Sequence, residues 1–343
     1  MRPRIILLSM LCLGYASSAW AQPVTLWGIQ RGCKRDTDLT SAVEGKLTLN
    51  AHRVVPLDRA AGAIARALGP AAPSADVIAL GPGDGRLETR LVGHLADQLP
   101  CPALRLYLLD ISQPLLGEAY RHASEALCLH PGITPVAILG DFHCLPRYSQ
   151  LSYAHPAAPR RKVVVLLGGT LGNLEHEHRF LRDSLRGFPP GTLLLLDYPV
   201  CFAPADRPAE VRARDPWLAG AAGAVVPAGA PGGAERIGWR ERVLAFWTGP
   251  LRRYLPGCSS VEVRLDLSCA PAASTVPGAY AIEALCRARV RGEPDRELSI
   301  FRLRRYEPLG LARTLRDLGW DAIDGWPYGH DVGYPRALSL FLR

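Results

Sequence analysis

Apolar residues follow two different patterns along the chain from about residue 76 onward. Five short runs consist almost entirely of Val, Leu and Ile. Between them apolar residues recur every three or four positions, as at Leu87, Leu91, Leu95 and Leu99. The second pattern predicts helices with one buried face, and the first predicts strands that are covered on both faces. The expected strands are 77–80, 104–112, 134–142, 162–169 and 192–198, and the expected helices are 87–99, 115–127 and 175–185.

Strands that alternate with helices predict a doubly wound α/β domain, in which a parallel sheet lies between two layers of helices. Two later segments, 261–267 and 281–290, instead alternate apolar and polar residues, which is typical of an antiparallel sheet with one face in water. With 343 residues, of which 48% are hydrophobic, the chain is long enough for one large domain or two.

The net charge of +8 does not indicate a nucleic-acid-binding protein. The only lysines are Lys34, Lys46 and Lys162, and the arginines never form a run of five or six. A nucleic-acid site is marked by basic residues clustered on one face or helix, so we expect no nucleic-acid partner. The cysteines contain no C-x-x-C pair, and we therefore expect no metal site.

Residues 1–21 have the pattern of a secretory signal peptide: two arginines, an apolar run, and small residues ending in Ala19-Trp20-Ala21. The apolar run is too short to span a bilayer, so no stable membrane span is expected. The alternatives are a start codon placed too far upstream and an apolar leader that is never cleaved.

Candidate binding residues stand at the ends of three consecutive strands, where parallel sheets bind their ligands. The loop GPGDG follows the first strand, and its Gly81 and Gly83 let the backbone approach a ligand closely. Asp110 ends the second strand, where a carboxylate can accept hydrogen bonds from both hydroxyls of a ribose. Asp141 and Phe142 end the third and suit an adenine amino group and ring face. Each motif taken alone also fits a plain turn or a helix cap. Together they favour an adenosine-type cofactor.

The glycine loop also distinguishes between cofactors. A dinucleotide fold requires G-x-G-x-x-G, with the pyrophosphate held at the helix N-terminus. Here Arg86 stands where the third glycine belongs, and the glycines are spaced for a wider loop. S-adenosylmethionine, which has no phosphate, fits this loop better than NAD does. An NAD-dependent oxidoreductase stays open as an alternative.

The segments LGPGDGRLETRL, YLLDIS, LGDF and LLGGTLGNLE, in this order and spacing, resemble the histidine-specific methyltransferase family. Its members trimethylate the α-amino group of histidine on the way to ergothioneine. The resemblance covers roughly 76–198 and returns from Glu307 to the end. It implies a class I methyltransferase, Rossmann-like fold with an inserted α+β substrate lobe. The implied segments are a leader-like 1–21, an N-terminal segment 22–70, an S-adenosylmethionine-binding core 71–200, the inserted lobe 201–300, and a last helix and strands 301–343 that complete the core.

The box GGTLGN is the most specific part of the resemblance. The family's pattern implies that Gly168 stands at the cofactor's edge and that Asn173 binds the amino-acid substrate near its amino group. An Asn amide offers both a donor and an acceptor, which suits an amine or a carboxylate. The alternative is that Asn173 caps a helix beginning near Leu174.

One part of the family's pattern is changed. The family reads the imidazole ring with a Glu-x-Ser pair just before its last helix. In the ungapped register the two positions are Phe301 and Leu303, and an insertion of four would restore the pair as Glu297 and Ser299. Four residues along a strand keep the same face. The ungapped register predicts a more apolar substrate site, which weighs against histidine itself as the substrate.

We therefore expect an S-adenosylmethionine-dependent methyltransferase that N-methylates an amino acid or a related small amine. No residue is assigned as the catalytic base. Since the cofactor is a cytoplasmic metabolite, we expect a cytoplasmic protein, in conflict with the leader-like segment 1–21. The other alternative is an exported, non-catalytic binding protein with a methyltransferase fold, for which that segment and the altered substrate site are the support.

Overall fold

The protein is described by a computed structural model. The described residues are 55–69, 74–100, 103–145, 160–174, 177–219, 224–227, 258–269, 274–290, 296–329 and 335–343. The leader-like segment 1–21 and most of the N-terminal segment 22–70 lie outside these ranges.

A sheet of seven strands organises the chain, in the order β10-β11-β5-β4-β1-β2-β3. The five strands that the apolar runs predict, β1 to β5, are parallel to one another, whereas β11 is antiparallel to both β5 and β10. The expected parallel, doubly wound sheet is therefore confirmed, and the last strand of the chain lies inside it. The bounds are β1 Ser74–Leu80, β2 Ala103–Asp110, β3 Ile133–Leu139, β4 Arg161–Leu166, β5 Leu193–Pro199, β10 Asp321–Tyr328 and β11 Arg336–Leu342.

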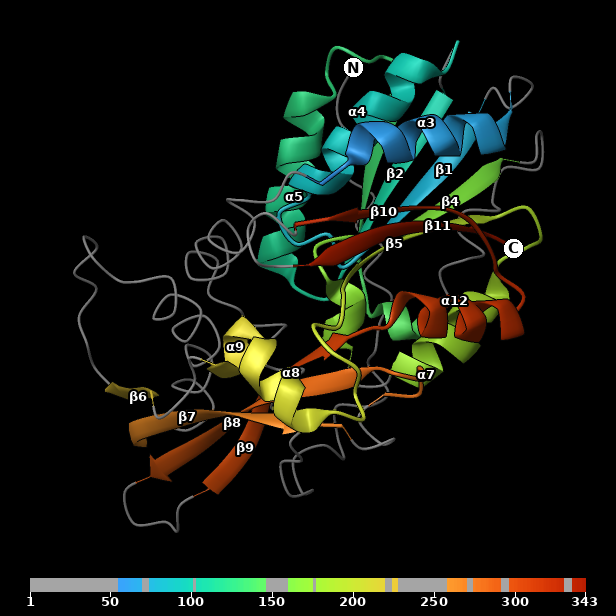
Figure 1. Cartoon of the computed structure of the whole chain (residues 1–343). Helices are drawn as coiled ribbons and strands as arrows, with labels where there is room; N and C mark the ends of the chain where they lie inside the picture. The colour runs from blue at the N-terminus through green and yellow to red at the C-terminus, as the bar shows by residue number, and fades with distance from the viewer. Residues whose placement is uncertain are drawn as a thin grey trace.

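Helices cover both faces of this sheet (Figure 1). On one face α3 (Leu57–Leu68), α4 (Arg86–Gln98) and α5 (Gln113–Ala126) pack on one apolar cluster. On the other face α12 (Pro308–Asp317) and a series of short helical turns pack on a second cluster. The two clusters are the two cores that a doubly wound sheet requires, because each strand contributes apolar side chains alternately to its two faces.

The sequence determines where α12 begins. Glu307 is its N-cap, and the Glu307 carboxylate accepts hydrogen bonds from the backbone N–H groups of Leu309 and Gly310. Pro308 follows at the first helical position, where its missing N–H costs nothing. Leu311 and Leu315 then bury one face of the helix against the sheet.

The expected helix 175–185 does not form as a single helix. A short α7 (Glu177–Arg179) passes into the π turn η4 (Phe180–Ser184) and the 3-10 turn η5 (Leu185–Gly187). Phe180 and Leu185 are fully buried by this winding. The Leu185 carbonyl accepts a 3-10-type hydrogen bond of 3.4 Å from the Phe188 N–H and a second hydrogen bond of 2.6 Å from the Arg343 side chain. The period of the sequence alone revealed neither this change of winding nor the contact with Arg343.

A second sheet, of four antiparallel strands, lies beyond the first in the order β6-β7-β8-β9 (Figure 1). The expected alternating strands are confirmed as β7 and β8. Because β9 runs to Arg305, it spans the expected boundary at residue 300, and the segment boundaries remain predictions. The bounds are β6 Ala224–Pro227, β7 Cys258–Ser268, β8 Tyr280–Val290 and β9 Arg296–Arg305, with α8 (Pro208–Arg214) and α9 (Pro216–Ala219) beside them.

A buried ion pair joins this second sheet to the helices beside it. Arg305 of β9 is paired with Asp215, which follows α8, and both side chains are essentially excluded from water. Asp215 also accepts a hydrogen bond of 3.0 Å from the Tyr280 hydroxyl.

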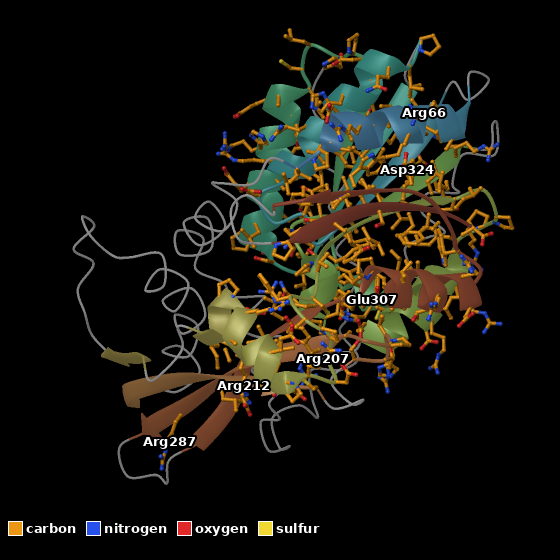
Figure 2. All side chains as sticks on the ribbon, viewed as in Figure 1. Arg66, Arg207, Arg212, Arg287, Glu307 and Asp324 are labelled. Atoms are coloured by element: carbon orange, nitrogen blue, oxygen red, sulfur yellow. The ribbon has the colours of Figure 1, made fainter. Side chains whose placement is uncertain are left out.

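At the far side of the large sheet, Figure 2 shows the exposed pair of Arg66 on α3 and Asp324 on β10, 4.0 Å apart. None of the helices described in the structure is long and apolar enough to cross a membrane.

Candidate functional site

The glycine loop after β1 has left-handed backbone at three positions. Gly81, Gly83 and Gly85 have φ values of 63°, 63° and 71°, a region that favours glycine. A Cβ atom on Gly81 would lie 3.1 Å from the Thr170 side chain and 3.3 Å from the Phe142 ring. The loops that follow β1, β3 and β4 therefore meet at Gly81, at the carboxyl edge of the sheet.

Asp110, the last residue of β2, holds the same loop. Its Oδ2 accepts a hydrogen bond of 3.3 Å from the backbone N–H of Gly83, and its Oδ1 accepts one of 2.9 Å from that of Ser112. The structure thus brings the predicted Gly83 and Asp110 together, in an arrangement suited to a cofactor ribose.

Asp141 and Phe142 lie just past the end of β3. Asp141 caps the 3-10 turn η1 (Phe142–Cys144): its Oδ1 accepts a 3.0 Å hydrogen bond from the His143 backbone and lies 2.9 Å from the His143 ring Nδ1. The capping interpretation is therefore correct for this residue, and a ligand would share the carboxylate with His143. Phe142 stacks on the His143 ring at 5.1 Å between centroids and meets Phe180 edge-on at 5.7 Å.

His143 is a site residue that the sequence did not reveal. Its Nε2 is buried and has no hydrogen-bond partner in the part of the chain that the structure describes. The signal was available in the run Asp-Phe-His, because a histidine two residues after a capping aspartate lies within reach of that carboxylate.

The box GGTLGN follows β4 and folds into two parts. Gly168 and Gly169 form a left-handed turn, with φ values of 71° and 83°, and residues Thr170–Asn173 form the 3-10 turn η3. The Thr170 hydroxyl donates to the Leu167 carbonyl at 2.9 Å, within this turn. A Cβ atom on Gly168 would meet nothing within 4 Å, so Gly168 faces open space at the edge where a cofactor is expected.

Asn173 is the last residue of η3, and it does not cap a helix. Leu174, which would be the first residue of a helix capped by Asn173, instead has extended backbone, with φ of −71° and ψ of 130°. The Asn173 Oδ1 is buried and has no hydrogen-bond partner among the residues described. A buried acceptor without a donor costs about 1–3 kcal/mol, so this oxygen favours a ligand that brings an N–H group.

Strand β9 runs along the second half of the box. A Cβ atom on Gly172 would lie 2.9 Å from the Arg304 carbonyl oxygen and 3.5 Å from a methyl group of Leu303. The buried Arg304 side chain donates to the Leu174 carbonyl, and the Tyr306 hydroxyl donates to the Leu171 carbonyl at 3.3 Å. The predicted Leu303 is therefore next to the box that carries Asn173.

A bulge in β9 places the two candidate Glu-x-Ser pairs on opposite faces of the sheet. Leu303 lies opposite Ile282 and Phe301 opposite Ala284, but Ser299 lies opposite Leu285. One extra residue of β9 thus separates Ser299 from Phe301, and the two positions fall on opposite faces of the sheet. The expectation that four residues keep the same face is wrong here, and only the ungapped positions share the face of Leu303.

The first half of the box is held from the other side by Asp197 at the end of β5. The Gly168 N–H donates to Asp197 Oδ2 at 2.9 Å, while Oδ1 accepts from Tyr328 and from Arg336 at 2.5 and 2.9 Å. Burial raises the pKa of the Tyr328 phenol. The sequence placed Asp197 at a strand end without a role, and its partners come from the last two strands of the chain.

The site therefore combines a glycine loop, a strand-end acid, an aromatic ring and a box with one buried unsatisfied oxygen. No group of His, Cys, Asp and Glu side chains in the described ranges is arranged to hold a metal ion. Every loop that contributes follows the carboxyl end of a parallel strand, which is where such sheets bind a ligand.

The chain is similar to a known family over the part that builds this site. Residues 55–201 match a family model described as "Histidine-specific methyltransferase, SAM-dependent". Over residues 55–201 this match confirms the expected resemblance to that family, the S-adenosylmethionine cofactor and the methyltransferase class of activity. None of the curated proteins compared with the chain matches it.

Several solved structures align with the chain at low similarity. A methyltransferase from Clostridium acetobutylicum is 10% identical at a TM-score of 0.40, over 90% of this chain and 92% of that one. The 1,6-didemethyltoxoflavin-N1-methyltransferase of Burkholderia thailandensis is 10% identical at 0.41, over 94% and 91%. The magnesium protoporphyrin IX methyltransferase of Synechocystis is 12% identical at 0.42, over 92% and 100%. TM-scores this low carry no argument about what the chain acts on.

Proposed function

We propose that this chain, residues 55–201 of which belong to the histidine-specific, S-adenosylmethionine-dependent methyltransferase family, methylates the nitrogen of an amino acid or a related small amine. The observation that carries the choice of acceptor is the buried Oδ1 of Asn173, which lacks a donor among the described residues. An amine supplies such a donor. An amide oxygen also orients the amine without giving it a proton, so the nitrogen lone pair stays available for attack.

The residues at the strand ends fit the cofactor. We assign the ribose hydroxyls to Asp110, the adenine to Asp141 and Phe142, and the cofactor's edge to Gly81, Gly83 and Gly168. The fit rests on the left-handed loop at Gly81 and Gly83 and on the open space in front of Gly168. When bound, S-adenosylmethionine supplies a methyl group that its sulfonium already activates. The chain mainly has to align the acceptor and exclude water.

The substrate's side chain is expected to be apolar rather than an imidazole. Leu303 lies beside Gly172 of the box, and the position of Phe301 falls on the same face of β9. Neither residue type can donate to or accept from a ring nitrogen. The positions of Glu297 and Ser299 are on the opposite face, so the bulge supports an acceptor with an apolar side chain over histidine itself.

The proposal is tested by calorimetric titration of S-adenosylhomocysteine into the full chain and into Asp110→Ala. Losing the ribose contacts is expected to cost about 1–3 kcal/mol, roughly ten- to hundredfold in affinity. Asp76→Ala is the matched control. Asp76 is fully buried in β1 of the same sheet but is paired with Arg160 at the opposite edge. Its substitution is expected to leave the affinity within about twofold.

The alternatives give different results in the same titration. A chain that binds NADH and not S-adenosylhomocysteine is an oxidoreductase, and a chain that binds neither is the non-catalytic protein. Once cofactor binding is established, a methyl-transfer assay over amino acids and small amines identifies the acceptor. The variant Asn173→Ala is expected to weaken acceptor binding and to leave S-adenosylhomocysteine binding unchanged.

A further inference from the structure

The C-terminal hairpin of β10 and β11 reaches the cofactor side of the sheet through two buried residues. Arg336, the first residue of β11, donates its Nε–H to Asp197 Oδ1 at 2.9 Å and to the Tyr328 hydroxyl at 2.8 Å. Its Nη2 lies 2.7 Å from the same Asp197 oxygen. The Arg336 and Asp197 side chains are only 4% and 1% exposed, so this ion pair is shielded from solvent.

The pair is connected directly to the turn in front of the cofactor position. Asp197 uses its second oxygen to accept the Gly168 N–H at 2.9 Å. The guanidinium of Arg336 fills the space beside Gly169, with two nitrogens 3.0 and 3.3 Å from the position of a Cβ atom there. One side chain thus packs against the turn and also holds the carboxylate that fixes it.

Charge explains why the turn needs an arginine. A buried carboxylate is costly unless an opposite charge and hydrogen-bond donors replace the water it has lost. The guanidinium of Arg336 supplies that opposite charge beside Asp197. Its planar fork reaches Asp197, Tyr328 and the face of Gly169 together.

We propose that Arg336 is a positioning residue for the cofactor site. It holds the Gly168–Gly169 turn in place by packing against Gly169 and by binding Asp197, which accepts the Gly168 N–H. Its expected contribution is to cofactor affinity rather than to stability alone. The inference rests on the placement of Gly168 at the cofactor's edge under the proposed function.

The amino ends of the parallel strands in the same sheet provide a matched control. Asp76 of β1 is fully buried and is paired with Arg160 at 2.6 Å, and Arg160 is 14% exposed. This pair is also an arginine on a buried strand acid, but it lies at the amino end of the parallel strands, away from every site residue. Arg160→Met therefore removes a comparable ion pair without touching the turn.

The experiment uses the full chain with Arg336→Met, Arg336→Lys and Arg160→Met. S-adenosylhomocysteine is titrated calorimetrically at a temperature where each variant is folded by circular dichroism, and Tm is measured separately. Both methionine variants are expected to lower Tm. Only Arg336→Met is expected to weaken binding, by about tenfold or more, because a displaced turn misplaces the groups that contact the ligand. Arg336→Lys is expected to restore part of the affinity, since it keeps the charge and loses the fork.

The remaining outcomes show whether only the inference about Arg336 is wrong or the proposed function as well. If Arg336→Met and Arg160→Met both bind like the wild type, Arg336 has only a structural role and the inference is wrong. If the wild type itself does not bind S-adenosylhomocysteine, the proposed function fails and this inference fails with it. Should Arg336→Met not fold, Tyr328→Phe removes one hydrogen bond from Asp197 and is expected to weaken binding several-fold. Unchanged binding by Tyr328→Phe and by Arg336→Lys together would then overturn the inference.

Discussion

Gly168 and Gly169 are consecutive residues with the same left-handed backbone and opposite surroundings. A Cβ atom on Gly169 would lie 3.0 Å from the Arg336 guanidinium, whereas one on Gly168 would meet nothing within 4 Å. Both positions favour glycine for their φ angles of 71° and 83°, but only Gly169 is also confined by a neighbour. The two glycines therefore serve different purposes, one open to a ligand and one packed on the ion pair behind it.

Alanine substitutions are expected to separate these purposes. Gly168→Ala should cost about 1 kcal/mol in the free energy of unfolding for its positive φ and should weaken S-adenosylhomocysteine binding, because its methyl group enters the ligand's space. Gly169→Ala should cost more stability, since it also displaces Arg336. Gly69→Ala is the control: Gly69 has a φ of 78° and open space around it, but it follows α3. Equal affinities for Gly168→Ala and Gly69→Ala would contradict the placement of Gly168. Denaturation and calorimetry measure both quantities.

The ion pair of Asp215 and Arg305 is expected to behave as a unit. Removing one partner, as in Asp215→Leu or Arg305→Met alone, leaves a buried charge unpaired and should cost about 3–5 kcal/mol of stability. The double variant Asp215→Leu with Arg305→Met should be clearly more stable than either single variant, because no charge is left without a partner. Urea denaturation of the four proteins gives the coupling free energy, and additive losses would show that the pair is not coupled.

Stability is expected to fall in alkaline solution because of Cys201. Burial raises the pKa of this thiol from 9.0 to about 12. The unfolded chain releases the proton from about pH 9 upward and the folded chain keeps it. The free energy of unfolding therefore falls between these two values, by about 1.4 kcal/mol per pH unit for one group. Burial also raises the pKa of the phenols of Tyr280 and Tyr328, which adds to the loss above about pH 10.

Urea denaturation at pH 8 and pH 10 measures this dependence. Cys201→Ala should reduce the loss of stability between the two pH values. Cys128→Ala, at an exposed thiol, should leave it unchanged. A loss that is the same in both variants as in the wild type would assign the pH dependence to other groups.

The face of β9 next to the box predicts how substrate choice can be changed. Introducing the family's pair with Phe301→Glu and Leu303→Ser is expected to bring histidine binding where the wild type has little, since a carboxylate and a hydroxyl can pair with both ring nitrogens. The wild type already has these two residue types at Glu297 and Ser299, but on the opposite face of β9, where we expect them not to give histidine binding. Calorimetric titration of histidine in the presence of S-adenosylhomocysteine compares the two proteins. No gain in the double variant would mean that these positions do not contact the acceptor.

The sequence indicated which residues of the expected cofactor half lie together because they belong to local patterns. Gly81, Gly83, Asp110 and Asp141 each stand at or shortly after the end of an apolar strand, and parallel strands bring these ends to one edge of the sheet. The five predicted strands were also confirmed. A short run of consecutive apolar residues indicates a strand that is buried on both faces.

What the sequence missed depends on contacts between distant segments. The partners of Asp197 are Tyr328 and Arg336, more than 130 residues later, and no period or spacing indicates such a pair. The bulge of β9 shifts the face of Ser299 by a single residue, which the alternation of the strand does not reveal. The contact of Arg343 with the Leu185 carbonyl in η5 is likewise made between distant segments.

The place of β11 inside the sheet matters while the chain is being made. Its two neighbours, β5 and β10, are both synthesised before it, so β5 has one unpaired edge until residues 336–342 have emerged. Such an edge can pair with another nascent chain or recruit a chaperone. Arg336 arrives with this same strand, so a nascent chain that has not yet reached β11 lacks the guanidinium that packs on the Gly168–Gly169 turn. Closure of the sheet and completion of the turn are therefore expected to occur together, when β11 emerges.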